Sequence, residues 1–348
     1  MKFVRGLVPI FLDFETFFDS KDGYTLENRA LSTVEYIRDA RYKTHGFAVA
    51  MPGMAPRWVS GANAAEELKG FDWSKAALIG HNLKFDGTIL AEHYGIRPAL
   101  YVDTLSMSYA VNGATLPSHS LNALAEHYGL PEKGQMLTDG IRDLVDFQEK
   151  ELAEYCIHDL EITIEIFERM RDDFPEGEYD LLDWTIRCFT TPKLELDVPL
   201  MLQVSEEEAA RREAFFVSPL ALECAAVIDS APAVLTKAGK PRKRHPVEPK
   251  KVFASNDMFP RVLQHFGYGV PLKASPSAAK KGEDIKIPAL ALGDPEFVEM
   301  LEGEDPKLRA LCEARVAAKS TLLETRAGKF AKVGATGAWP FDVSVSRR

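Results

Sequence analysis

The feature that most constrains the fold is Ile10–Thr16, an apolar run that ends in two acidic residues. Such a run predicts a buried strand, and strand side chains two residues apart share a face. Asp13 and Glu15 therefore point the same way, while Leu12 and Phe14 point to the other face. Adjacent carboxylates repel each other, more so when buried, and a divalent cation removes the repulsion by binding their oxygens. The pair predicts either a metal site or a strand end that enters solvent, where acids carry no such cost.

Length and composition bound the class of protein. At 348 residues the chain is long enough for two domains, and 46% hydrophobic with 27% charged residues is typical of a soluble globular protein. The sequence holds no apolar run of membrane-spanning length, so we expect no membrane partner. Its four cysteines are scattered without CxxC spacing. That pattern argues against a zinc site or a disulfide framework and suits the reducing cytoplasm.

The net charge of −10 is evidence against a tight, non-specific duplex binder, but it is compatible with a nuclease whose own site is acidic. Although the chain as a whole is acidic, one segment contains a cluster of basic residues. Such a run is either a solvated loop or a contact to phosphates, and without an aromatic residue it would bind the backbone of a nucleic acid and not stack on bases. The cluster consists of Lys237, Lys240, Arg242, Lys243, Arg244, Lys250 and Lys251.

The order of expected elements indicates a mixed α/β domain, a sheet with helices packed on it, followed by a mainly helical C-terminal region. Glycine, proline and capping residues delimit the elements. The expected strands are 7–14, 44–51, 57–59, 76–80 and 101–104. The expected helices start near 33 and cover 64–69, 82–94, 104–111, 120–128, 140–145, 148–172, 203–226, 255–267 and 294–331, with 229–250 as a mobile hairpin or loop.

Two further segments carry polar residues in suggestive places. Asn82 and Asp86 follow the strand at 76–80, and ligand sites in open α/β sheets favour such strand ends. Tyr155 and Asp159 are four apart on the long helix, so they project from one face. Each has an ordinary structural explanation as well. Asp86 would favour the dipole of a helix that starts there, and Tyr155 would pack on a half-buried face beside an exposed acid.

Together, the Asp13-x-Glu15, Asn82-x3-Asp86 and Tyr155-x3-Asp159 segments resemble the three exonuclease motifs of the DEDD superfamily. The tyrosine is typical of the DEDDy branch. Order, internal spacing and expected secondary structure all agree with that family. The resemblance implies a ribonuclease-H-like mixed sheet, 3′→5′ hydrolysis of nucleic acid and two bound divalent metal ions, Mg²⁺ or Mn²⁺.

The resemblance also assigns catalytic and metal-binding roles. Two metals about 4 Å apart can clamp the attacking and leaving oxygens of an in-line displacement. Asp13 would bridge both ions, and Glu15 with Asp159 would complete the site that activates water. Asp86 would hold the leaving-group metal. Tyr155 would hydrogen-bond the attacking water and orient it without ionising.

Candidate substrate-binding residues lie beside the motifs. Asn82 is expected to position the backbone or the terminal nucleotide, and Thr16 adjoins the first acid pair. Phe17, Phe18 and Phe85 are candidates for stacking on a frayed 3′ base, although at least one of Phe17 and Phe18 is expected to be a core residue. The basic cluster contributes Lys243 and Arg244 as candidate phosphate contacts.

The second half resembles the thumb and its approaches in family A DNA polymerases of the phage type. Ser255–Asp257 and Val270–Lys273 carry the first part of this likeness. Arg315–Thr321 and Glu324–Arg326 carry the second. The resemblance covers the chain from about residue 8 to about residue 332. In that family these segments grip the duplex backbone next to the proofreading domain.

These likenesses predict three parts: a 3′–5′ exonuclease domain at 1–190, a partial thumb-like helical region at 191–335 and an atypical tail at 336–348. A family A polymerase continues with fingers and palm, whose acidic motifs do not appear in this sequence. We therefore expect a polymerase truncated to its proofreading exonuclease and part of its thumb. Template-directed synthesis by this chain alone is not expected.

Three functions fit these expectations. The first is a metal-dependent 3′→5′ DNA exonuclease of the proofreading type, the N-terminal part of a phage-type polymerase in DNA replication. The second is a subunit of a split polymerase whose palm and fingers are on another chain. The third is a DEDDy ribonuclease that trims RNA, against which the thumb-like half argues. The expected partners are a single-stranded 3′ end, primer–template duplex and, for the second function, the separate polymerase chain. The expected location is the cytoplasm, that of a bacterial host if the source is a phage.

Overall fold

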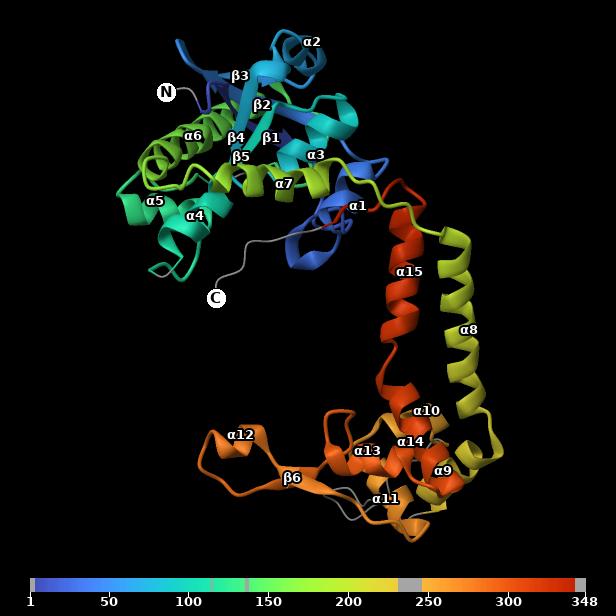
Figure 1. Cartoon of the computed structure of the whole chain (residues 1–348). Helices are drawn as coiled ribbons and strands as arrows, with labels where there is room; N and C mark the ends of the chain where they lie inside the picture. Colours follow the sequence, from blue (N-terminus) through green and yellow to red (C-terminus); the bar gives the residue numbers. More distant parts are fainter. Residues whose placement is uncertain (1–3, 114, 135–137, 231–245, 342–348) are drawn as a thin grey trace. The chain divides into compact units, whose positions relative to one another are not determined.

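The computed structural model describes residues 4–113, 115–134, 138–230 and 246–341, and it divides into two compact units (Figure 1). The first unit comprises the described residues up to Leu196 together with those from Thr336 on. The second comprises the described part of Asp197–Ala335. A five-stranded sheet forms the centre of the first unit, whereas the second is mainly helical, as the sequence predicted.

The sheet has the order β3-β2-β1-β4-β5, with β1 in the middle. β1 pairs antiparallel with β2 and parallel with β4, so the predicted mixed sheet is confirmed. β1 reaches beyond the predicted end at residue 14, which places Glu15 and Thr16 within the strand. The strands are β1 Val8–Thr16, β2 Thr44–Met51, β3 Met54–Ser60, β4 Ala76–Gly80 and β5 Leu100–Asp103.

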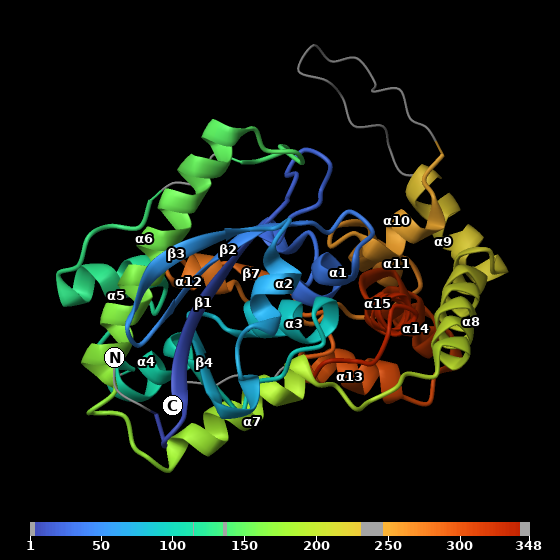
Figure 2. The same ribbon diagram turned by 90° about the horizontal axis from the view of Figure 1, so that it is seen from above.

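Helices cover both faces of this sheet (Figures 1 and 2). Helix α6 packs against β1, β2 and β3, and the ring of Phe11 meets that of Phe167 on α6 with centroids 5.5 Å apart. On the other face, Phe14 stacks on Tyr94 at the end of α3. Alternation along β1 thus turns Asp13 and Glu15, which share a face with Phe11, toward α6. The helices of this unit are α1 Thr33–Arg38, α2 Ala64–Lys69, α3 Lys84–His93, α4 Thr104–Asn112, α5 Leu121–Tyr128, α6 Asp146–Met170 and α7 Glu178–Thr190, with short 3₁₀ turns at Glu27–Arg29 and Trp73–Lys75.

The helix expected at 140–145 is wrong, because tertiary contacts hold this segment in turns and extended backbone. Gly140 has φ +75° and donates its N–H to the carbonyl of Phe18. The Arg142 guanidinium lies over the Phe17 ring, 5.2 Å from its centroid. Helix α6 begins only at Asp146, because these long-range contacts override the helical tendency of the local sequence. Helix α7 was not predicted.

The second unit is built from short helices around an apolar core that includes Phe216, Phe253, Phe259 and Phe297. The helical pattern at 203–226 divides into α8 and α9, because Ser218 caps a new helix that begins at Pro219. Its described elements are α8 Val198–Phe216, α9 Pro219–Ser230, α10 Pro249–Ala254, α11 Met258–His265, β6 Leu272–Ala274, α12 Pro276–Ala279, β7 Lys286–Pro288, α13 Pro295–Glu302, α14 Pro306–Lys319 and α15 Leu322–Gly334.

Two segments singled out in the sequence meet inside this second unit. Arg315 on α14 is 3% exposed, and its guanidinium donates to the carbonyl oxygens of Phe253 and Ser255 and to the side chain of Asn256. A buried guanidinium needs such acceptors, because its charge and donors would otherwise be unpaired. Arg315 therefore ties α14 to the end of α10 and to the turn that precedes α11, and it is a structural residue of this unit. Most of the loop expected at 229–250 lies outside the described residues.

The last described residues return to the first unit. The backbone N–H of Trp339 donates to the Leu194 carbonyl at 2.7 Å, and that of Phe341 donates to the Cys188 carbonyl at 3.1 Å. The start of the predicted tail is thus ordered against the segment that follows α7. In the described parts of both units, every helix is too short or too polar to cross a membrane.

Candidate metal-binding active site

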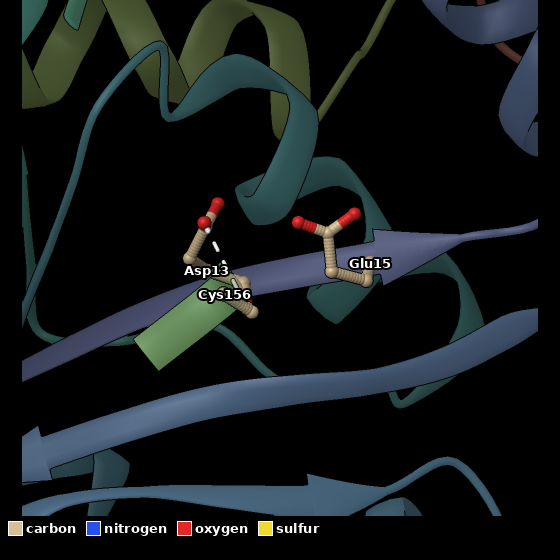
Figure 3. A group of neighbouring side chains, drawn as sticks. All are labelled: Asp13, Glu15 and Cys156. Atoms are coloured by element: carbon tan, nitrogen blue, oxygen red, sulfur yellow. Dashed lines mark hydrogen bonds between the residues drawn. The ribbon is translucent and has the colours of Figure 1, made fainter. Parts of the chain in front are cut away.

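The first acid pair projects from the central strand. Asp13 and Glu15 leave β1 on the same side, as Figure 3 shows. Their partners on β2 are Ala48 and Gly46, and the Trp58 ring on β3 occupies the space where a side chain at Gly46 would lie. Glu15 is 7% exposed, and Asp13 is half-buried. The sequence-based alternative, a strand end that enters solvent, is therefore wrong for this pair.

Two helices bring further acids close to this pair. Asp86 lies in the first turn of α3 and is 3% exposed, and its Oδ1 accepts the backbone N–H of Phe14 at 2.9 Å. Asp159 on α6 is 1% exposed, and its Oδ1 has no hydrogen-bond partner among the described residues. A buried carboxylate oxygen without a partner is costly unless a ligand satisfies it.

Burial and the neighbouring acids raise the pKa values of Asp13, Glu15 and Asp86. Burial, followed by repulsion from Asp159, raises the pKa of Asp13 from 3.8 to about 7. Burial and the charge of Asp13 raise the pKa values of Glu15 and Asp86 well above their usual range. These groups cannot all ionise at neutral pH without a compensating cation. Buried, mutually repelling carboxylates with an orphaned oxygen have the donor chemistry of a site for a hard divalent cation such as Mg²⁺.

Cys156 on α6 lies beside Asp13 and close to Glu15, a contact that the sequence analysis missed. Its Sγ and oxygens of Asp13 and Glu15 lie within 4.8 Å of one another (Figure 3). The thiol donates to the Asp13 carbonyl at 3.3 Å and lies 3.8 Å from Asp13 Oδ2. Burial and the neighbouring charges raise the pKa of Cys156 well above its usual range, so the thiol stays protonated. Through its hydrogen bond to the Asp13 carbonyl, Cys156 ties α6 to the strand that carries the acid pair.

A lysine also reaches the cluster, and the sequence analysis missed it. Lys133 comes from the segment between α5 and α6, and its Nζ lies 2.9 Å from Asp159 Oδ2. The same ammonium contacts Tyr155, four residues before Asp159 on α6. Burial raises the pKa of the Tyr155 phenol above its usual range, which keeps its hydroxyl able to donate. No spacing rule relates Lys133 to the acids, so only the folded chain reveals it.

Two cavities flank the acids. The larger, about 700 Å³, is polar and has Asp13, Asp159 and Lys133 at one end. The smaller, about 210 Å³, adjoins Glu15 and is mostly aromatic and aliphatic. The other residues that line the larger cavity are His81, Asn82, Leu105, Tyr109, Leu116, Pro117, Ser118, His119, Ser120, Leu121, Asn122 and Thr163. The smaller one is lined further by Phe14, Thr16, Phe18, Thr25, Leu26, Glu27, Tyr36 and Phe85.

The predicted substrate-binding residues have different surroundings. Phe18 and Phe85 line the smaller cavity, whereas Phe17 is 6% exposed and belongs to the core. Thr16 lines it too, with Oγ1 2.8 Å from the Tyr36 hydroxyl. Lys243 and Arg244 lie outside the described residues.

Asn82 has a backbone reason for its identity as well as a place in the larger cavity. Its φ is +63°, in the left-handed region that asparagine tolerates better than most residues. This conformation turns the chain from β4 into α3 and so brings Asp86 to the cluster. The asparagine is thus explained in part by the turn, a role that the sequence analysis did not include.

Comparisons with known proteins agree with this geometry. Residues 61–174 match the model of a 3′–5′ exonuclease family, a range that contains Asp86, Tyr155 and Asp159 but not the first acid pair. No curated protein matches this sequence. The polymerase domain of Pol1 from M. smegmatis, solved with DNA primer-template and dNTP, is similar in structure, with TM-score 0.52 and 13% identity over 92% of this chain. The chain spans 46% of that polymerase chain.

NrnC from Brucella melitensis, solved with bound Mg²⁺, aligns with a TM-score of 0.36 and 15% identity over 51% of this chain and 80% of that one. A further NrnC structure, bound to pGG, aligns with a TM-score of 0.37 at 14% identity, again over 51% and 80%. These two likenesses are too low to carry an argument. The family match and the polymerase fold indicate a ribonuclease-H-like 3′–5′ exonuclease domain followed by a helical region, and hydrolysis by a nuclease is the activity that this family implies.

Proposed function

We propose that this chain is a metal-dependent 3′→5′ exonuclease that removes nucleotides from DNA 3′ ends, as the proofreading part of a family A polymerase does. The observation that carries the proposal is the convergence of four acids from β1, α3 and α6, of which Asp159 has an orphaned oxygen. Such a cluster has no structural use without a cation. Residues 61–174 match an exonuclease family, and this match supports a catalytic role for a cation bound at the cluster.

Asp13, Glu15, Asp86 and Asp159 would hold two Mg²⁺ or Mn²⁺ ions. When bound, these ions would supply an activated water and stabilise the leaving oxygen of the phosphodiester. Tyr155 would accept or donate a hydrogen bond to that water and hold it in line with the phosphorus. The phenol is suited to orientation and not to proton abstraction, because its pKa is raised by burial.

The two cavities suggest how a 3′ end would lie. The terminal base would enter the smaller cavity beside Glu15, where Phe18 and Phe85 offer apolar and aromatic surface. The sugar-phosphate that precedes it would lie in the larger, polar cavity, which Asn82 lines. The proposed substrate is a frayed or single-stranded 3′ end, whose unpaired terminal base is free to enter the smaller cavity.

DNA is favoured over RNA by the second unit. A fold similar to a polymerase over 92% of this chain gives the helical region a reason to exist beside a DNA exonuclease. A ribonuclease that trims RNA ends remains the second candidate. The expected synthesis partner, a chain with palm and fingers, would be needed for polymerisation, and the basic residues Lys243 and Arg244 would contact phosphates of a primer–template duplex.

The test compares DNA and RNA strands of one sequence, each carrying a 5′ label, with purified protein and Mg²⁺. The proposal expects a ladder that shortens from the 3′ end, faster on DNA, and blocked when the 3′ nucleotide is joined to a bulky group. Faster shortening of the RNA strand would favour the ribonuclease. A product cut internally would contradict the exonuclease proposal.

A further inference from the structure

Lys133 places a fixed positive charge inside the acid cluster. Its Nζ lies 2.9 Å from Asp159 Oδ2, and the Lys133 side chain is 40% exposed where that of Asp159 is 2% exposed. The aliphatic stem therefore runs from solvent and delivers the ammonium to a buried carboxylate. The same ammonium lies over the Tyr155 ring, 5.4 Å from its centre. One cation thus contacts both side chains of the third motif.

The backbone that carries Lys133 is held against α6. The carbonyl oxygen of Glu132 accepts a hydrogen bond from His158 Nε2 at 2.9 Å. On the other side, a Cβ on Gly134 would lie 2.9 Å from the ring of Tyr155, so the chain approaches that ring as closely as only glycine permits. These contacts, one residue before and one after Lys133, fix where its side chain starts. The ammonium in the cluster is therefore a built feature and not a chance surface pairing.

The charge of Lys133 acts on the whole site. It opposes the rise in pKa of Asp13 and of Glu15 as well as pairing with Asp159. Among the described residues that line the larger cavity, it is the only lysine or arginine. A phosphodiester that entered this cavity would meet the carboxylates of Asp13 and Asp159 and this single ammonium. Lysine is suited to such a task, because its flexible stem can exchange one anionic partner for another.

We propose that Lys133 is a catalytic residue of the exonuclease site: it occupies Asp159 when no metal is bound, yields that carboxylate to the divalent ion, and then donates hydrogen bonds to a non-bridging oxygen of the scissile phosphate. This inference rests on the proposed function for its last step only. Metal binding at Asp159 and pairing with Lys133 compete for the same carboxylate. A released ammonium would then stabilise the charge that grows on the phosphate oxygens during displacement.

The first experiment measures Mn²⁺ binding to the full chain without nucleic acid, by calorimetry or by electron paramagnetic resonance. Lys133→Met keeps an unbranched side chain one atom shorter and removes the charge, so Mn²⁺ should bind about 3- to 10-fold more tightly, the effect of losing one competing ion pair. Lys150→Met on α6 is the matched control, because Lys150 pairs loosely with Glu154 at 3.8 Å on the surface. Equal Mn²⁺ affinity in wild type and Lys133→Met would overturn the competition.

The second experiment measures single-turnover hydrolysis of single-stranded DNA at saturating Mn²⁺. Lys133→Met should slow it by roughly 10- to 100-fold, as expected for loss of one charged donor in a transition state, and Lys133→Arg should recover part of the rate. An unchanged rate in Lys133→Met would refute the phosphate contact. Lys133→Gln serves in both experiments if the methionine variant fails to fold. A wild-type chain that binds Mn²⁺ but cleaves no nucleic acid would refute the proposed function, while the Mn²⁺ measurement would still decide the competition.

Discussion

Asp13→Asn should stabilise the metal-free protein and destabilise the metal-loaded one. Asparagine keeps the shape of the side chain and removes the charge that repels Asp159 and Glu15. In EDTA at pH 8 the variant should therefore melt at a higher temperature than wild type. With excess Mn²⁺ the order should reverse, because wild type gains the free energy of a bound ion and the variant has lost a proposed bridging ligand.

The size of the effect follows from the pKa of Asp13. A rise from 3.8 to about 7 corresponds to roughly 4 kcal/mol at about 1.4 kcal/mol per tenfold change. Because the four acids share their repulsion, we assign about half of it, ~2 kcal/mol, to Asp13. For a folded unit of this size, that shifts the melting temperature by about 4–8 °C. Excess Mn²⁺ at about 100 times its Kd would add ~2.7 kcal/mol to wild type.

The upward direction of the Asp13 pKa shift also determines how the stability difference between Asp13→Asn and wild type depends on pH. A carboxyl group whose pKa is raised by folding contributes stability below its unfolded pKa, and this stability is lost as the pH rises through the folded value. The gap between Asp13→Asn and wild type in EDTA should thus be absent near pH 4, grow with pH and level off above about pH 7. Differential scanning calorimetry of both proteins across this range is the assay. Asp173→Asn, at an exposed acid, is the control and should show no such gap.

A variant that melted below wild type in EDTA at pH 8 would refute the reasoning, because Asp13 would then be stabilising without metal. A gap that did not change with pH would refute the assignment of the effect to its carboxylate.

Three further predictions follow from the same site. Tyr155→Phe should slow hydrolysis by up to about 100-fold with unchanged Mn²⁺ affinity, because the phenol orients water and is not a ligand, and an unchanged rate would make it a packing residue. Cys156→Ser should leave metal binding and activity near wild type, since the protonated thiol is not a ligand, and loss of Mn²⁺ binding by calorimetry would contradict this. Primer–template DNA, dNTPs and Mg²⁺ should yield shortened primers and no extension on a sequencing gel. Extension that persists in Asp13→Ala would reveal a synthesis site.

The sequence predicted the sheet and its helices well, because apolar strands and capping residues act locally. The capping box predicted near residue 33 is an example: Ser32 accepts the N–H of Glu35, whose carboxylate accepts the N–H of Ser32. Alternation along β1 likewise fixed which side chains share a face with Asp13. The predictions failed where contacts between distant parts of the chain determine the local structure, as in the helix wrongly expected at 140–145. They also missed that the helix expected at 203–226 divides into α8 and α9 at Ser218.

For the candidate site, regular spacing within one element was informative and contact between elements was not. A spacing of two residues on a strand, or of four residues on a helix, shows which side chains share a face. Lys133 meets Asp159 only because the segment between α5 and α6 folds back on α6, and Cys156 meets Asp13 only because α6 packs on the sheet. Phe17 is buried at 6% exposure, in agreement with the expectation that one of Phe17 and Phe18 is a core residue, but the sequence did not tell which of the two it would be.

The measurement that tests the central claim most directly is hydrolysis of 5′-labelled single-stranded DNA by wild type, Asp13→Ala and Asp173→Asn, each with Mg²⁺ and with EDTA. Stepwise shortening from the 3′ end by wild type and Asp173→Asn in Mg²⁺ alone, with none by Asp13→Ala, is the result we predict. Shortening by Asp13→Ala at a rate near that of wild type, or shortening by wild type that persists in EDTA, would contradict the assignment of a metal-dependent exonuclease site to these acids.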